Sequence, residues 1–125
     1  MDSSEGEIQF NNCTINSTAE NLIYTGVWGY EVNNIKIRFT ECNITHTGDN
    51  LIGFFALPAN NSLIEFDNCK IIKNKGSLVK WLLNYSRAGL KNKISVDVIF
   101  KNTAVERSLV IDNAVDSDHA RVVFE

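Results

Sequence analysis

The sequence predicts an all-β solenoid, in which short strands of successive repeats stack on one another, and three observations lead to this prediction. A six-residue phrase with Phe first, Cys fourth and Ile sixth occurs at residues 10–15, 39–44 and 66–71. A weaker fourth copy begins at Phe100 and a stub of a fifth ends at Phe124, so the Phe-to-Phe spacings are 29, 27, 34 and 24 residues. One Pro, seven Gly and 16 Asn suit many strands joined by Asn-rich turns. Repeats of this length bury their apolar faces only against their neighbours, which predicts a single stacked core.

The first strand of each repeat is expected to run up to the Phe and to turn a corner just after it. In the first copy, Ile8, Phe10, Cys13 and Ile15 face inward by alternation, and Asn12 is one extra residue that interrupts the alternation. Asn readily adopts the left-handed backbone that a sharp bend can need. The same corner is therefore predicted at the corresponding positions, which are Glu41, Asn68 and Asn102.

A further strand is expected later in each repeat, where a Leu is followed by Ile or Val. This pair comes twelve residues after the Phe in the first three copies and nine residues after it in the fourth. The two patterns together predict a core with the aromatic rings in one column. Its members are Phe10, Phe39, Phe66, Phe100, Ile15, Ile44, Ile71, Leu22, Leu51 and Leu78.

Outward-facing residues test this register, because neighbours in stacked strands should be compatible. The residue three before each Phe is in turn Glu7, Lys36, Leu63, Asp97 and Arg121, so neighbouring repeats tend to have opposite charges. The residue just before the Phe adds Arg38 beside Glu65. Exposed pairs of this kind contribute only a few tenths of a kcal/mol each, but they agree with the register.

The third repeat is longer than the others and has the punctuation of a helix. Ser77 is a candidate N-cap and Gly89 a candidate C-terminal stop. The repeat register instead requires a strand at Leu78 and Val79. We expect a strand that gives way to a short helical or looped excursion over residues 81–89.

The stretch Ile37-Arg38-Phe39-Thr40-Glu41-Cys42-Asn43-Ile44, followed by Gly48-Asp49-Asn50-Leu51-Ile52, resembles a coil of the right-handed parallel β-helix of the pectin-lyase-like superfamily. The resemblance spans residues 7–124 and implies about four to five short coils of that fold. Polysaccharide-cleaving members have Asn-Thr-Asp, paired Asp, His-Gly and Arg-x-Lys elements on successive coils. Here Asn50 replaces the second acid of the paired Asp, and neither His46 nor His119 is followed by Gly. The chemistry of the family is therefore not expected to carry over.

The chain length of 125 residues predicts one domain, residues 1–125, which is either complete or a segment of a longer solenoid. No run approaches the roughly 18 apolar residues of a membrane span, and the first seven residues lack the pattern of a secretory signal. We expect a cytoplasmic protein, or an extracellular or virion-surface protein if the chain is cut from a longer one. A short stack has two open ends, which predicts self-association, a partner that covers an end, or continuation of the chain.

The three cysteines, Cys13, Cys42 and Cys69, occupy the same place in their repeats and are predicted to form one interior column of buried thiols. Disulfides between neighbours remain an alternative. A zinc site would need clustered Cys and His at short spacings, which His46 and His119 do not provide. We expect neither a metal nor a cofactor.

Charge is unevenly distributed along the chain, with a net of minus seven over residues 1–67, plus seven over residues 68–96 and minus three over residues 97–125. We call the middle segment, with its two aromatic residues, the basic band. It is interpreted either as a solvated coil or as a face that binds an anionic partner. The candidate binding residues are Lys70, Lys73, Lys75, Lys80, Trp81, Tyr85, Arg87, Lys91 and Lys93.

The expected partner is an acidic protein surface or another copy of the chain, with a polysaccharide as an alternative. The sequence pI of about 5.4 argues against nucleic acid. The leading hypothesis is a non-catalytic binding module, either a surface or fibre segment or a small intracellular inhibitor or immunity-type protein. The rival is a polysaccharide-cleaving or polysaccharide-binding protein, in which Asp49 would pair with Asp112, Asp116 or Asp118.

Overall fold

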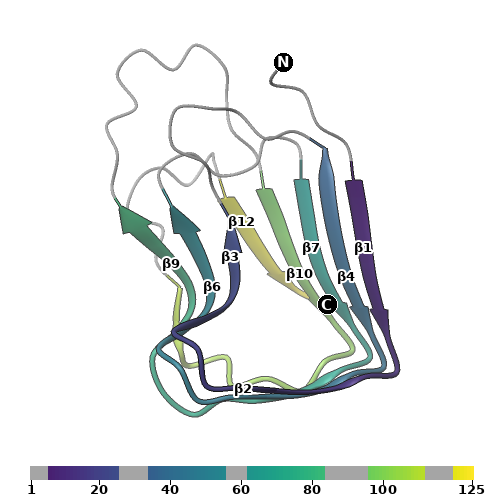
Figure 1. Ribbon diagram of the computed structural model, residues 1–125, viewed down its shortest axis with the longest axis horizontal. Helices are drawn as coiled ribbons and strands as arrows, with labels where there is room; N and C mark the ends of the chain where they lie inside the picture. The colour runs from purple at the N-terminus through teal and green to yellow at the C-terminus, as the bar shows by residue number, and fades with distance from the viewer. Residues whose placement is uncertain (1–5, 26–33, 56–61, 84–95, 112–119) are drawn as a thin grey trace.

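The computed structural model describes residues 6–25, 34–55, 62–83, 96–111 and 120–125 (Figure 1). We call the first four ranges repeats 1 to 4. In the described residues the chain forms strands β1 to β12 and no helix, and all strand pairs are parallel. The all-β prediction with in-register parallel strands is confirmed.

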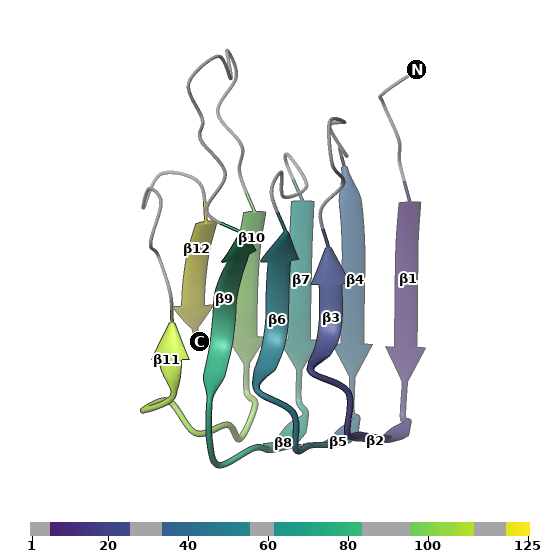
Figure 2. The same ribbon diagram turned by 60° about the vertical axis from the view of Figure 1, so that its left-hand side comes forward.

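The strands belong to three sheets, and successive repeats contribute to these sheets in the same order (Figure 2). A five-stranded sheet contains β1 (Gly6–Asn11), β4 (Ile35–Thr40), β7 (Ser62–Asp67), β10 (Val96–Lys101) and β12 (Ala120–Phe124). A three-stranded sheet contains β2 (Thr14–Ser17), β5 (Asn43–His46) and β8 (Lys70–Ile72). A four-stranded sheet contains β3 (Asn21–Thr25), β6 (Asn50–Phe55), β9 (Ser77–Leu83) and β11 (Val110–Ile111).

The Phe residues of the repeated phrase form one column on the inner face of the five-stranded sheet. Register pairs Phe10 with Phe39, Phe39 with Phe66, Phe66 with Phe100, and Phe100 with Phe124. The rings stack with centroids 4.8, 4.8, 5.1 and 5.2 Å apart, within the range of favourable aromatic pairs. The predicted aromatic column is confirmed. The remaining predicted core residues are buried, or half-buried against the core in repeat 1.

The predicted corner is also confirmed, because the residue two positions after the stacked Phe of each of repeats 1 to 4 has a left-handed backbone. The φ angles are 55° at Asn12, 54° at Glu41, 56° at Asn68 and 46° at Asn102. Each N–H at this position still bonds to the next repeat, for example from Glu41 to the carbonyl of Asp67 at 3.0 Å. The chain therefore bends without losing its pairing.

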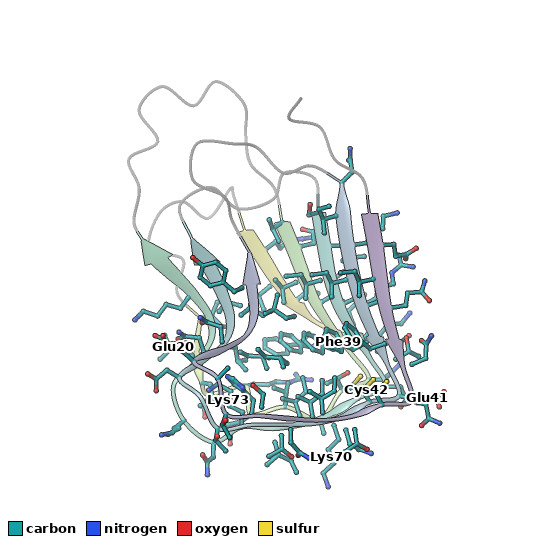
Figure 3. The ribbon with its side chains drawn as sticks, viewed as in Figure 1. Glu20, Phe39, Glu41, Cys42, Lys70 and Lys73 are labelled. Atoms are coloured by element: carbon teal, nitrogen blue, oxygen red, sulfur yellow. The ribbon has the colours of Figure 1, made fainter. Side chains whose placement is uncertain are left out.

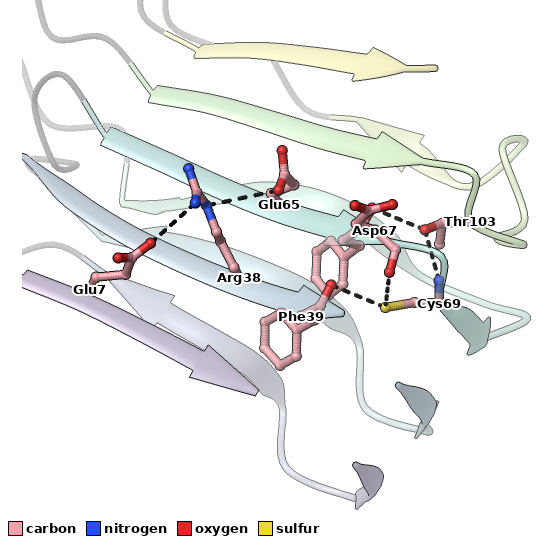
Figure 4. A network of polar contacts seen from close by, with 8 residues as sticks. Glu7, Arg38, Phe39, Glu65, Asp67, Cys69 and Thr103 are labelled. Carbon is pink, nitrogen blue, oxygen red and sulfur yellow. Dashed lines mark hydrogen bonds and ion pairs between the residues drawn. The ribbon is translucent and has the colours of Figure 1, made fainter. Parts of the chain in front are cut away.

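The cysteine column lies just beyond this corner and joins each repeat to the preceding one. The Cys42 thiol donates to the carbonyl of Phe10 at 3.3 Å, and the Cys69 thiol donates to that of Phe39 at 3.3 Å. In repeat 4 the Thr103 hydroxyl takes this place and donates to the carbonyl of Phe66 at 3.0 Å (Figure 4). All three cysteines are free thiols, and Cys42 and Cys69 are buried. The column of buried thiols is confirmed for Cys42 and Cys69, whereas Cys13 is half-buried, and Thr103 is an additional member.

The predicted excursion over residues 81–89 starts later than expected. Strand β9 continues through Leu83, because Trp81 and Leu83 pair with Phe54 and Phe55 of β6 across a register shift. The prediction of an excursion that begins at Trp81 is therefore wrong. Residues 84–89 lie outside the described part of the chain.

Candidate functional site

The described residues of the basic band lie on different faces of the stack. Lys70 is exposed on β8 in the three-stranded sheet, and Lys80 is exposed on β9 in the four-stranded sheet. Lys75 is exposed in the turn between these strands. The two sheets form different sides of the molecule (Figure 1), so the structure does not bring these lysines together on one surface.

Lys73 corrects the predicted band, because its side chain is only 4% exposed. Figure 3 shows Lys73 inside the outline of the three sheets, whereas Lys70 points away from them. The ammonium of Lys73 donates to the carbonyl of Gly48 at 2.6 Å and to that of Asp49 at 3.1 Å. Burial lowers the pKa of Lys73, the nearby Asp49 opposes this effect and Lys75 adds to it. Lys73 is thus not part of an exposed binding surface, because its buried ammonium bonds to two carbonyls of the preceding repeat.

The other members of the band remain a prediction. Trp81 is placed by its backbone in β9. Tyr85, Arg87, Lys91 and Lys93 lie outside the described residues.

Lys73 belongs to a polar column that the sequence interpretation missed. A polar residue comes seven positions after the Phe in each of the four repeats, at Ser17, His46, Lys73 and Arg107. Ser17 pairs in register with His46. This period-based signal was present in the sequence, but alternation alone does not show which polar residues face inward.

His46 is 2% exposed, and both of its ring nitrogens are engaged. Nε2 donates to the carbonyl of Asn50 at 2.6 Å, so Nδ1 accepts from the Ser17 hydroxyl at 3.0 Å. Burial lowers the pKa of His46, and the charge of Lys73 lowers it further, against the effect of hydrogen bonds with the backbone of Asn50 and Glu20. A neutral imidazole with both nitrogens occupied is a structural group, and it has no free nitrogen to bind a metal or move a proton.

The end of the stack formed by repeat 1 is open and apolar. A hollow of about 410 Å³ lies there. At this end Ile8 is 52% exposed, although the residues at its position in repeats 3 and 4, Ile64 and Val98, are 3% and 0% exposed. Tyr24 is also exposed at this end, at a position where repeat 3 has the exposed Lys80. The residues that line the hollow are Ile8, Phe10, Ile15, Leu22, Ile23, Tyr24, Ile37 and Phe39. We call this surface the open end.

The opposite end has a different character. The guanidinium carbon of Arg107 lies 4.8 Å from the centroid of the Phe124 ring, a cation–π contact. Because Phe100 stacks on one face of that ring at 5.2 Å, Arg107 covers the other face. The last ring of the column is therefore covered by a cation.

Charged side chains of neighbouring strands pair on the outward face of the five-stranded sheet, and Figure 4 shows the group around Arg38. Arg38 lies 3.3 Å from Glu7 and 3.8 Å from Glu65, and Arg121 lies 3.1 Å from Asp97. These contacts confirm the register predicted from alternating charges. A shallow groove of about 690 Å³ crosses the same face, lined by Glu7, Asn34, Lys36, Ser62, Leu63, Asp97 and Ile99.

No metal-binding group of side chains is assembled within the described ranges. These ranges hold no group of three or more His, Cys, Asp and Glu side chains placed around a metal ion. Asp49 is exposed, and its expected partners Asp112, Asp116 and Asp118 lie outside these ranges.

The described chain also contains no helix of a length and hydropathy that would cross a membrane. Comparisons with protein-family models, with curated proteins and with solved structures found no match.

Proposed function

We propose that this chain is a non-catalytic interaction module built as a right-handed parallel β-helix, and that it binds other proteins through the open end of repeat 1. The observation that carries the proposal is the 52% exposure of Ile8, at a position that is 3% and 0% exposed in repeats 3 and 4. An apolar surface that stacking would bury is instead presented to solvent. Exposed contiguous apolar surface of this kind is typical of interaction sites.

The β-helix assignment is supported by the strand order. Consecutive repeats add parallel strands to the same three sheets, which is the arrangement expected of a β-helix. Connections between parallel strands of one sheet are almost always right-handed, which favours the right-handed form. The resemblance to pectin-lyase-like coils agrees with this fold and supplies no catalytic residues for the chain.

The chemistry of the open end favours a protein partner. Strands β1, β2 and β3 each lie at the edge of their sheet, so their backbones present hydrogen-bonding groups beside an apolar hollow. An extended protein segment with alternating apolar residues satisfies both requirements by adding a strand. Either a fibre or surface segment or a small inhibitor-type protein would use an end in this way.

Site-specific photo-crosslinking tests the proposal. A photoreactive amino acid is placed at Gln9, which is exposed on edge strand β1, and in a control protein at Thr45 on the inner strand β5. In cells that naturally express the protein, we expect a protein adduct from position 9 and none from position 45. The proposal fails if position 9 gives no adduct, or if both positions give equal yields.

A further inference from the structure

We infer that the open end of one copy docks against the open end of a second copy, about a two-fold axis that passes between the two β1 strands at Gln9. This inference rests on the proposed function and names the partner. It follows from three features of the described residues, which are the exposure along the columns, the difference between the two ends and the sequence of β1.

The exposure of side chains along the columns shows how much burial a neighbouring repeat provides. The column of Ile8 continues through Ile37, Ile64, Val98 and Val122. Ile8 is 52% exposed, Ile37 and Val122 are half-buried, and the central Ile64 and Val98 are 3% and 0% exposed. Phe10 is half-buried, whereas Phe66 has a ring on both faces and is 0% exposed. A surface with the same residue pattern, laid on the open end, would complete these columns.

The opposite end of another copy fits this requirement poorly. Arg107 covers the free face of Phe124, so an apolar rung placed there would have to displace or bury its guanidinium. That end is also stepped, because β12 extends the five-stranded sheet beyond β10, while repeat 4 contributes the last residues of the other two sheets. The open end is level by comparison, since β1, β2 and β3 all come from repeat 1.

The sequence of β1 is compatible with itself in the antiparallel direction. Pairing centred on Gln9 places Glu7 opposite Asn11 of the second copy, and Ile8 opposite its Phe10. Gln9 then faces Gln9, whose amides can donate to and accept from each other. The charge of Glu7 is already offset by Arg38 at 3.3 Å. No like charges meet along the strand, and apolar residues meet on its inner side.

The size of the open end sets the expected strength of the dimer. A six-residue strand is about 20 Å long, so an end of about 20 Å by 20 Å covers about 400 Å² per copy, or about 800 Å² for the two copies. An interface of this size is typical of weak, transient association. We therefore expect a dissociation constant in the micromolar range and a two-fold dimer that closes on itself.

Introducing a charge at the two-fold axis tests the inference, because residue 9 faces residue 9 of the second copy only in this arrangement. Sedimentation is measured from about 1 μM to about 1 mM, which spans the range expected for such an interface. Gln9→Lys and Gln9→Glu should each weaken the dimer about tenfold or more by like-charge repulsion, and an equimolar mixture should restore it. Val123 faces outward at the corresponding position of β12, so Val123→Lys is the matched control and should dimerise like the wild type. Circular dichroism of each variant verifies that it is folded.

Three sedimentation results would each overturn the two-fold dimer. They are a wild type that stays monomeric throughout, a mixture that fails to recover, and a Val123→Lys effect as large as that of Gln9→Lys, which indicates head-to-tail stacking. The crosslinker at position 9 separates this failure from that of the proposed function. An adduct of twice the chain mass supports the dimer, whereas an adduct with a different protein supports the interaction module and overturns the second copy as its partner. Absence of any adduct overturns both.

Discussion

Replacing Glu41 by Asn should stabilise the protein. Glu41 has a φ of 54° at a corner where the other three repeats have Asn at 55°, 56° and 46°. Its side chain is exposed and points outward (Figure 3), and its backbone N–H donates to the carbonyl of Asp67 at 3.0 Å whichever side chain is present. The substitution therefore changes mainly the cost of the backbone conformation.

That cost can be estimated from the preferences of the two residue types. A left-handed backbone costs an ordinary L-residue about 1–2 kcal/mol, and Asn is several-fold enriched there. An enrichment of about fivefold corresponds to about 1 kcal/mol, because RT is about 0.6 kcal/mol. We expect Glu41→Asn to increase the free energy of unfolding by about 0.5–1 kcal/mol and Tm by roughly 2–4 °C.

Urea denaturation of three variants provides the measurement. Glu41→Gln removes the charge but keeps a side chain without the left-handed preference, and it should change stability little. Asn68→Glu makes the reverse substitution at an exposed corner with a φ of 56°, and it should destabilise by a similar amount. The reasoning is refuted if Glu41→Asn is no more stable than Glu41→Gln.

Three further predictions concern a turn, a buried imidazole and the cysteine thiols. Gly76 has a φ of 82°, and a Cβ there would lie 2.0 Å from the Asp49 carbonyl oxygen, so Gly76→Ala should cost more than about 2 kcal/mol in urea denaturation; an unchanged midpoint would contradict this. Burial lowers the pKa of His46 below 6.5, so the unfolded chain binds more protons. The stability that His46 contributes should be complete above pH 6.5 and decline as pH falls below it, and His46→Gln should flatten this slope. Burial raises the pKa of Cys69, so iodoacetamide should label half-buried Cys13 first; equal labelling rates by mass spectrometry would contradict the column geometry.

The register of the stack could be predicted because one bulky residue type marks it. Phe at spacings of 24 to 34 residues requires loops of different lengths, yet all five rings lie in one column. Asn12, Asn68 and Asn102 marked the corner through a backbone preference that belongs to the residue type itself. Local signals of this kind do not depend on the surrounding structure.

The placement of Lys73 and the difference between the two ends could not be predicted in this way. A Lys among other lysines is usually solvated, and burial of Lys73 depends on two carbonyls of the preceding repeat that point toward it. Arg107 occupies the same position in its repeat, yet its guanidinium lies over the Phe124 ring. Both outcomes depend on neighbours that are distant in sequence.

The strand order gives the stack a one-dimensional mechanical character. Strand β7 has neighbours on both sides, whereas β1 and β12 each have one, so either terminal strand can detach while the centre stays paired. Local unfolding should begin at the terminal strands and progress toward the centre of the sheet. Amide hydrogen exchange should therefore be fastest in the terminal strands and slowest in β7. Detachment of one terminal strand therefore leaves the remaining strands of the sheet paired with one another.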